Sequence, residues 1–280
     1  MLYHQPVLLN VEAKRKLLMS SFLNSSKILS RTALKPGDII RLNHFLAESG
    51  ICSRREADRL IKSGQIFVNG EICTDLSSKI DPLKDIVIYK DKRVQPLIGK
   101  EYIMLNKPKG YLVTHSDEYN RKTIYELLPD NAQNLRYVGR LDKDSEGLLL
   151  LTNDGELLNL LTHPSSKIEK VYKVRINRRL SKKELNTLRQ GVPIEGGKTQ
   201  SAGVFVKNSS DNAMTLKIVL TEGKKREIRQ MIEAVGAKVL SLRRVQFANL
   251  ILKDLPLGRW RHLTRAEIKA LKDSVEQSKR

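Results

Sequence analysis

The sequence is poor in the residues from which many metal, disulfide and cofactor sites are built. Its 280 residues include two cysteines, Cys52 and Cys73, and five histidines without ligand spacing, which argues against a disulfide framework or a zinc site. The dinucleotide pattern G-x-G-x-x-G, the phosphate loop G-x-x-x-x-G-K-[ST] and the hydrolase pattern G-x-S-x-G are all absent. We therefore expect no metal and no cofactor, so any chemistry must rest on ordinary side chains.

Long apolar runs are missing, and acidic residues are few. No stretch approaches the roughly 20 apolar residues of a membrane helix, so we expect a soluble protein that does not enter a membrane. The chain has 51 Lys and Arg against 31 Asp and Glu, a formal charge of +20. Such an excess attracts polyanions, and nucleic acid is the first candidate. A basic face kept only for solubility is the alternative, which the clustering of Lys and Arg disfavours.

Residues 1–38 differ in composition from the rest of the chain. They are basic and serine-rich, with Glu12 and Asp38 as their acidic residues. We predict a poorly ordered basic extension on a cytoplasmic bacterial protein. An organelle transit peptide, which has a similar composition, is the less favoured alternative.

Residues 39–92 have the pattern of a small domain. Two helices are predicted over 41–50 and 53–64, followed by two short strands joined by Asn69-Gly70, a strong hairpin signal, and by a strand over 85–90. The second helix carries a basic stripe, which either tracks phosphates or is simply its solvated side. The segment resembles the RNA-binding module of small-subunit ribosomal protein four. The resemblance implies RNA contacts by Arg54, Arg55, Arg59 and Lys62.

Residues 93–100 are predicted to be a linker, and residues 101–275 a larger domain with a short tail, 276–280. Its predicted strands cover residues 102–106, 111–114, 148–151, 170–176, 203–208 and 214–220, with a turn at 107–110 between the first two. Its predicted helices cover residues 123–129, 155–164, 181–191 and 224–236. Because strands and helices do not alternate strictly, we predict an α+β fold around a mostly antiparallel mixed sheet.

Three segments of the larger domain carry candidate chemistry. Asp142 lies in GRLDKDSEGLLLLTNDG, Tyr172 in IEKVYKVRI, and Arg229 beside the apolar stripe of the helix in TEGKKREIRQMIEAVG. Each has a plainer interpretation: Asp142 as a turn residue, like Asp144 and Asp154, Tyr172 as a strand aromatic, and Arg229 as a surface arginine. A carboxylate, a phenol and a guanidinium from separate segments could instead meet in one cleft.

Together these segments resemble the pseudouridine synthase family, in its ribosomal-RNA branch with a front domain like ribosomal protein four. The motifs are GRLD-x-x-[ST]-x-G-L-L-L-L-T-N-D-G, KxY-x-V, EGK-x-R-x-IR-x-M and LPLGRWRHLT at 255–264, and the resemblance runs from residue 41 to about 275. Ser145 stands where the family often has Thr, and both side chains carry a hydroxyl.

The resemblance implies an RNA isomerase that converts uridine to pseudouridine without a cofactor. Asp142 is then the essential acid, Tyr172 packs on the uracil, and Arg229 pairs with Asp142. We expect RNA contacts from Lys107, Arg140, Lys224, Lys225 and Arg226, with Arg243 and Arg244 holding flanking phosphates.

The implied partner is ribosomal RNA or a precursor ribosomal particle, favouring the large subunit, and the protein is expected to be a monomer. A non-catalytic RNA-binding or ribosome-assembly factor is the rival function. The sequence leaves open which uridine is modified.

Overall fold

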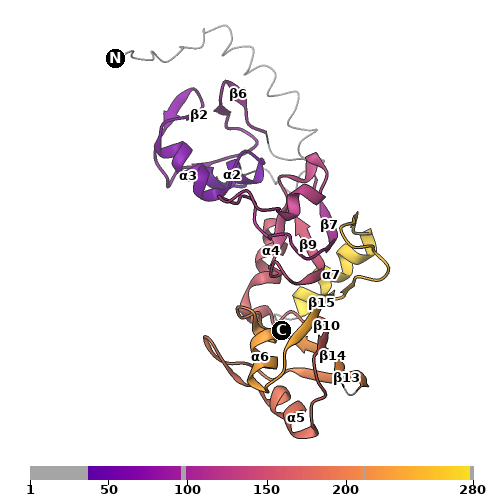
Figure 1. Cartoon of the computed structure of the whole chain (residues 1–280). Coiled ribbons are helices and arrows are strands. Elements are labelled where there is room, and N and C mark those ends of the chain that lie inside the picture. Colours follow the sequence, from indigo (N-terminus) through magenta and orange to yellow (C-terminus); the bar gives the residue numbers. More distant parts are fainter. Residues whose placement is uncertain (1–36, 96–98, 211, 278–280) are drawn as a thin grey trace. The chain divides into compact units, whose positions relative to one another are not determined.

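The structure is a computed structural model that describes residues 37–95, 99–210 and 212–277 (Figure 1). The chain divides after Lys100 into two compact units. The predicted extension, 1–38, lies outside the described residues except for its last two. Within the described ranges, no helix is both long and apolar enough to cross a bilayer.

The first unit combines two helices with short strands. Its elements are β1 Ile40–Arg41, α2 Leu42–Glu48, α3 Arg54–Lys62, β2 Ile66–Val68, β3 Glu71–Cys73, β4 Lys79–Ile80, β5 Val87–Tyr89 and β6 Lys92–Arg93. Strands β3-β2-β5-β6 form a four-stranded sheet, and β1 pairs with β4.

Local signals in the sequence account for these elements. The Ser53 hydroxyl accepts a hydrogen bond from the Glu56 amide (3.2 Å) and caps α3. The turn between β2 and β3 places Asn69 and Gly70 at positive φ (53° and 92°), as a tight hairpin requires. Val94, which follows β6, is buried in the core of this unit. The predicted linker at 93–100 therefore overlaps the folded unit at its first two residues.

The second unit is built on a nine-stranded mixed sheet, counted over the described residues. Its strands are β7 Tyr102–Lys107, β8 Arg136–Val138, β9 Glu146–Thr152, β10 Lys170–Ile176, β13 Gly203–Ser210, β14 Ala213–Leu220, β15 Val239–Phe247, β16 Leu250–Ile251 and β17 Trp260–His262. A separate hairpin pairs β11 Pro193–Ile194 with β12 Gly197–Lys198. The α-helices are α4 Gly155–Thr162, α5 Lys182–Gln190, α6 Glu227–Ala234 and α7 Arg265–Gln277, and three 3₁₀ turns are η1 Ile124–Leu127, η2 Asp130–Ala132 and η3 Pro164–Ser166.

The order of the main sheet is β13-β14-β10-β15-β9-β7-β17, with β8 on β9 and β16 on β15. All pairings are antiparallel except β9 with β15, where Arg243 lies opposite Glu146 and Arg244 opposite Gly147. This parallel pairing, called the parallel joint, connects two halves of the sheet. One half has the order β9-β7-β17 and the other β13-β14-β10-β15. The predicted α+β fold with a mostly antiparallel mixed sheet is confirmed.

The core of the second unit has three parts. Helices α5 and α6 cover one face of β10, β13 and β14. Helices α4 and α7 pack against the even-numbered side chains of β9, such as Leu148 and Leu150. The segment with η1 and η2 covers the other face of β7 and β9, including Leu149 and Leu151. The four consecutive leucines thus serve two cores, because successive side chains of a strand point to opposite faces.

Several predicted elements differ from those observed. Residues 111–114 form no strand and make a single bridge, Leu112 with Thr123, and 123–129 form the 3₁₀ turn η1 instead of an α-helix. Asp154 is more than a turn residue: it is buried, its carboxylate caps α4 by accepting from Leu157 N, and it also accepts from the Tyr102 hydroxyl (2.6 Å). Strand β15 was not predicted, because its two central arginines interrupt the apolar pattern.

Candidate active site

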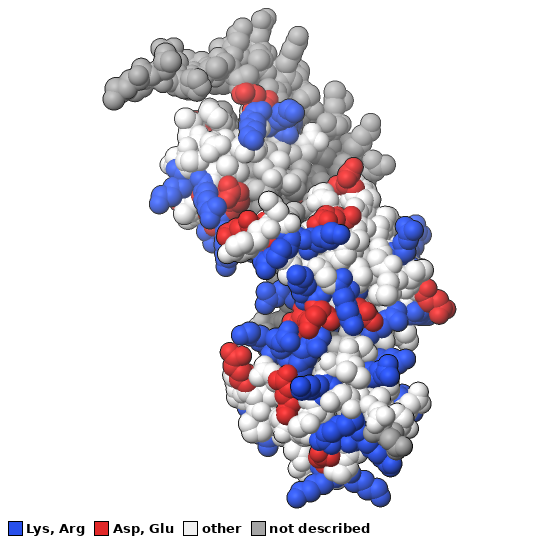
Figure 2. All heavy atoms as spheres, in the orientation of Figure 1, with Lys and Arg blue, Asp and Glu red and all other residues white. Residues whose placement is uncertain are grey.

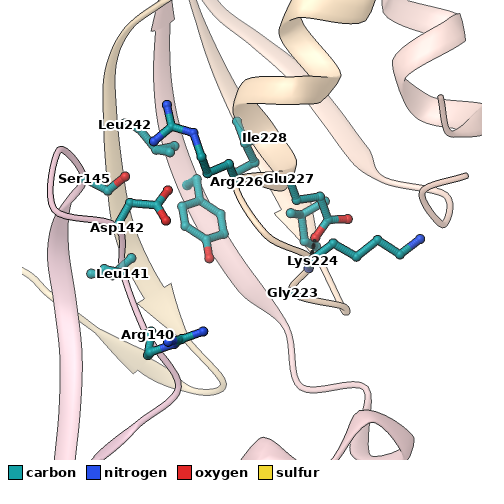
Figure 3. A pocket seen from close by; sticks show the side chains of 12 residues that line it. Arg140, Leu141, Asp142, Ser145, Gly223, Lys224, Arg226, Glu227, Ile228 and Leu242 are labelled. Atoms are coloured by element: carbon teal, nitrogen blue, oxygen red, sulfur yellow. Dashed lines mark hydrogen bonds between the residues drawn. The ribbon is translucent and has the colours of Figure 1, made fainter. Parts of the chain in front are cut away.

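Asp142 lies in the loop between β8 and β9, at the mouth of the leucine strand. The loop closes as a β-turn, in which the Ser145 amide donates to the Asp142 carbonyl (3.1 Å). Ser145 is buried while Asp142 is half-buried. Figure 3 shows the Asp142 carboxylate pointing from one wall into a pocket whose other wall carries Arg226 and Glu227. A carboxylate is thus held at the surface of a cavity by a loop of fixed shape.

Tyr172 lines the same pocket from β10. It lies opposite Ile218 of β14 and Arg244 of β15, and its ring packs against two of the three cores of this unit. This packing fixes an aromatic ring in the same cavity as the Asp142 carboxylate. The structure therefore brings Asp142 and Tyr172 together, as the sequence predicted that they could be.

A wider groove adjoins this pocket and shares Asp142 with it. Leu112, Asp117 and Arg121 line its outer part, and Arg140, which is exposed, lines both the pocket and the groove. Asp142 therefore lies at the boundary between a narrow cavity and a wider groove. This is a suitable place for a group that acts on one nucleotide of a longer chain.

Lys107 does not contact RNA as predicted, because its side chain is fully buried. Its ammonium donates to the carbonyls of Ser145 (2.9 Å), Asp142 (3.0 Å) and Pro108 (3.1 Å). Burial lowers the pKa of Lys107 to about 8, although the neighbouring Asp142 carboxylate opposes the shift. Lys107 fixes the backbone of the Asp142 turn, and its donors are directed at carbonyls rather than at solvent.

Arg229 pairs with Asp144 rather than with Asp142. Its Nη2 lies 3.0 Å from Asp144 Oδ2 and donates to the Asp144 carbonyl (3.2 Å). Arg226 approaches the same carboxylate at 3.6 Å. Asp144, predicted to be a plain turn residue, thus ties the Asp142 loop to the start of α6. The sequence could not show which of two carboxylates, two residues apart in one turn, faces the helix.

The remaining predicted RNA contacts have mixed outcomes. Arg226 is exposed and adopts a left-handed backbone (φ 51°) at the start of α6, which is a strained conformation for a residue with a side chain. The Lys224 ammonium points away from Asp142 (Figure 3) and pairs with Glu222 at 3.4 Å. Lys225 is exposed and lies 3.4 Å from Glu195. Arg244 is buried and donates to the Leu148 carbonyl (2.7 Å), so it cannot hold a phosphate.

A carboxylate pair that the sequence analysis missed, Glu222 and Glu227, includes a residue that lines the pocket, Glu227. Glu227 is buried, and it accepts a hydrogen bond from the Lys224 amide (2.9 Å). Burial raises the pKa of Glu227 to about 7, and the adjacent Glu222 adds to the shift. Burial acts to raise the pKa of Glu222 as well. Hydrogen bonds from Gln200 and Glu227 outweigh burial and hold this pKa below its ordinary value. A signal was available, because Glu227 lies four residues before the buried Met231 and so on the same helical face.

The four basic residues predicted to bind RNA in the first unit, Arg54, Arg55, Arg59 and Lys62, are exposed on α3. They lie opposite the buried Ala57, Leu60 and Ile61. Arg59 forms an ion pair with Glu56 (2.9 Å). For the second unit, Figure 2 shows that Lys and Arg side chains predominate over acidic ones on the face drawn.

The groups around Asp142 suit acid–base or nucleophilic chemistry on an RNA base or sugar. Among the described residues no cluster of three or more His, Cys, Asp or Glu is placed to hold a metal ion. The Asp142 carboxylate and the Tyr172 ring share the pocket, which basic residues also line. A helical module with an exposed basic stripe precedes this domain in the chain. These features define an RNA-modifying enzyme.

Comparison with known proteins identifies the class. Residues 101–234 match the RNA pseudouridylate synthase family, and residues 40–87 match the S4 domain. The chain belongs to the RNA pseudouridylate synthase family, whose members are RNA isomerases. Its substrate is therefore RNA.

Relatives match nearly the whole chain. The ribosomal large subunit pseudouridine synthase B of Bacillus subtilis is 37% identical over 243 residues, which cover 85% of this chain and 98% of that protein. The dual-specificity RNA pseudouridine synthase RluF of Escherichia coli K12 is 35% identical over 245 residues, 87% of this chain and 82% of that protein. A crystal structure of a pseudouridylate synthase superposes with a TM-score of 0.60 at 29% identity, covering 83% of this chain and 99% of that one.

Proposed function

We propose that this protein converts one specific uridine of ribosomal RNA, in the large subunit, to pseudouridine, with Asp142 as the essential acid. The observation that carries the proposal is the Asp142 carboxylate at the wall of the pocket that Tyr172 lines, on a turn whose backbone carbonyl accepts a hydrogen bond from the buried Lys107. The names of the bacterial relatives support ribosomal RNA as the substrate. They also support action in the cytoplasm, where ribosomes are assembled.

The reaction requires a group beside the sugar of the target nucleotide. A carboxylate at the anomeric carbon can attack it as a nucleophile, or can remove a proton from the sugar while uracil departs. Either route uses the negative charge of Asp142. Uracil then turns over and rejoins the same sugar through its ring carbon five, which loses a proton.

Tyr172 and the basic rim provide binding rather than the first chemical step. A uridine must leave its base stack to enter the pocket, at a cost of a few kcal/mol. The Tyr172 ring can replace part of the lost stacking and stands beside the base to accept the proton from ring carbon five. Arg140 and Arg226, exposed at the rim, can hold the flanking phosphates. Arg229 acts indirectly in this proposal, by fixing the Asp142 loop through Asp144.

The decisive experiment is Asp142→Asn. Asparagine is nearly isosteric with aspartate but uncharged, so the fold and most of the RNA affinity should persist. Both candidate roles of the carboxylate disappear. We expect release of tritium from ring carbon five of labelled uridine in ribosomal RNA to fall below detection.

Asp254→Asn is a matched control in the same unit, because Asp254 is exposed in a turn. It should retain full activity. Substantial turnover by a folded Asp142→Asn protein would remove this residue from the mechanism. Mapping pseudouridines in ribosomal RNA of cells with and without the gene would identify the target uridine and its subunit.

A further inference from the structure

Strands β10, β13, β14 and β15 have one covered face and one open face. Val174 of β10 and Leu216 of β14 point into the core, where they pack with Leu188 of α5 and Met231 of α6. Because side chains alternate along a strand, the neighbours of Val174 on β10 point to the opposite face. Those neighbours, Lys173 and Arg175, are exposed.

The register of the sheet aligns basic residues on this open face. Lys173 lies opposite Lys217 of β14 and opposite Arg243 of β15, and Lys217 in turn lies opposite Phe205 of β13. Directly opposed residues share a face, so these four side chains form a row across four strands. Phe205 is 53% exposed, and the Lys217 ammonium lies 5.8 Å from its ring centroid. We call Phe205, Lys217, Lys173, Arg243 and the adjacent Arg175 the basic sheet face.

This charge is not neutralised within the sheet. Like charges directly opposite each other on neighbouring strands destabilise a sheet, and the four strands contain no Asp or Glu. The nearest acid in register is Glu146, opposite Arg243 across the parallel joint. Within the described part of the chain, none of the four basic residues forms an ion pair. The surface is therefore complementary to a polyanion.

We infer that the basic sheet face binds a second segment of the substrate RNA. Lys217, Lys173, Arg243 and Arg175 would hold its phosphates, and Phe205 at the end of the row would stack on an unpaired base. Exposed aromatics beside basic residues on an open sheet suit single-stranded RNA, because bases can stack while phosphates are neutralised. The choice of RNA over another polyanion rests on the proposed function.

The bound segment is distinct from the one that carries the target uridine. Tyr172, which lines the pocket, lies between Val171 and Lys173 on β10. Its side chain therefore points to the face opposite the basic sheet face. A large folded RNA can present one segment to the pocket and another to the far side of the sheet, whereas a short oligonucleotide around the target uridine cannot.

The test is a triple substitution, Lys173→Gln with Arg175→Gln and Lys217→Gln. It is made in the Asp142→Asn protein so that the RNA is not modified during the measurement. The probe is large-subunit ribosomal RNA transcribed in vitro, titrated at several salt concentrations. We expect weaker binding and a slope of log K against log salt that is less steep by about two, since each lost contact to a single strand removes about 0.7. The melting temperature should not fall, because like-charge repulsion is relieved.

The matched control is Lys182→Gln with Lys183→Gln and Lys269→Gln, which removes the same charge from exposed positions of α5 and α7. It should leave the salt slope nearly unchanged. An equal loss in the control, or an unchanged slope in the triple variant, would overturn the inference. If the triple variant binds naked RNA normally but binds precursor ribosomal particles more weakly, the basic sheet face contacts an acidic protein. That result would also overturn the inference.

A second variant, Phe205→Leu, separates stacking from charge. It should weaken binding while leaving the salt slope unchanged, and unchanged affinity would remove Phe205 from the proposed surface. These measurements are independent of turnover. If the triple variant shows the expected salt dependence but the protein with Asp142 intact releases no tritium, the proposed function is wrong and the RNA-binding face still stands.

Discussion

Two carboxylates separated by one residue have different surroundings in the loop between β8 and β9. Asp142 points into the pocket, whereas Asp144 is half exposed and contacts Arg229 and Arg226. At this scale the sequence established which residues carry charge but not which partners they meet. Asp144 lies in the turn as predicted but also pairs with Arg229, which was expected to pair with Asp142.

Asp144→Asn should reduce turnover only a few-fold. The amide keeps the turn, and Arg229 still donates to the Asp144 carbonyl, so the loss is that of a partly exposed ion pair, about 0.5–1 kcal/mol. The check is kcat and KM for ribosomal RNA beside those of Asp142→Asn. Complete loss of activity in a folded Asp144→Asn protein would mean that the wrong carboxylate has been assigned to the chemistry.

Glu227→Gln should change how stability depends on pH. The pKa of Glu227 rises from 4.5 to about 7 on folding, chiefly through burial. Between these values the folded protein holds a proton that the unfolded chain has released, so stability falls as pH rises through this range and levels off above it. Glutamine cannot ionise and should remove this decline.

Melting temperatures from pH 5 to pH 8 provide the measurement. We expect the difference between wild type and Glu227→Gln to grow with pH, on the order of 1 kcal/mol or 2–4 °C. Glu233→Gln, an exposed change on the same helix, should follow the wild-type profile. Parallel profiles for wild type and Glu227→Gln would show that the carboxylate is not protonated in the folded state.

At the scale of elements, the parallel joint depends on a glycine. Gly147 lies between β7 and β15 with φ at 111°, and a Cβ there would stand 2.2 Å from the Arg244 carbonyl oxygen. No side chain fits without moving β15. Only the register across the joint, which links distant parts of the sequence, reveals this requirement.

Gly147→Ala should destabilise the second unit by more than 3 kcal/mol, on the order of a large core defect. Gly110→Ala is the matched control: Gly110 also has positive φ (91°), but no atom lies within 4 Å of its would-be Cβ. It should cost about 1 kcal/mol, the backbone strain alone. Thermal melts of both variants make the comparison, and equal melting temperatures would exclude a steric role for Gly147.

Elements with a strong local pattern were predictable, and those defined by distant contacts were not. The hairpin at Asn69-Gly70, helices α3 and α5, and strands β10 and β14 follow from caps, turns and periodicity. Strand β15 was missed because Arg244 is buried through a hydrogen bond to Leu148, nearly 100 residues earlier in the chain. Lys107 was misassigned for the same reason, since two of its carbonyl partners, those of Asp142 and Ser145, lie on another segment.

For the whole molecule, the first unit should supply affinity and the second unit chemistry. Arg55→Ala with Arg59→Ala should weaken binding to ribosomal RNA and lower the salt slope by about one to two, with little change in kcat at saturating RNA. Arg55 should contribute more, because Arg59 already pairs with Glu56. Titrations at several salt concentrations test this, and an unchanged slope would leave the stripe on α3 as ordinary solvated surface.

The parallel joint between β9 and β15 also determines when the protein becomes active during folding. Asp142 precedes β9 in one half of the sheet, while Tyr172 and Arg226 belong to the other half. Each half has an apolar cluster built mainly from its own strands, yet joining the halves requires closure of a loop of about 100 residues, which is slow. Both halves can therefore be compact while the pocket does not yet exist. The recovery of catalysis during refolding should accordingly lag behind the recovery of secondary structure.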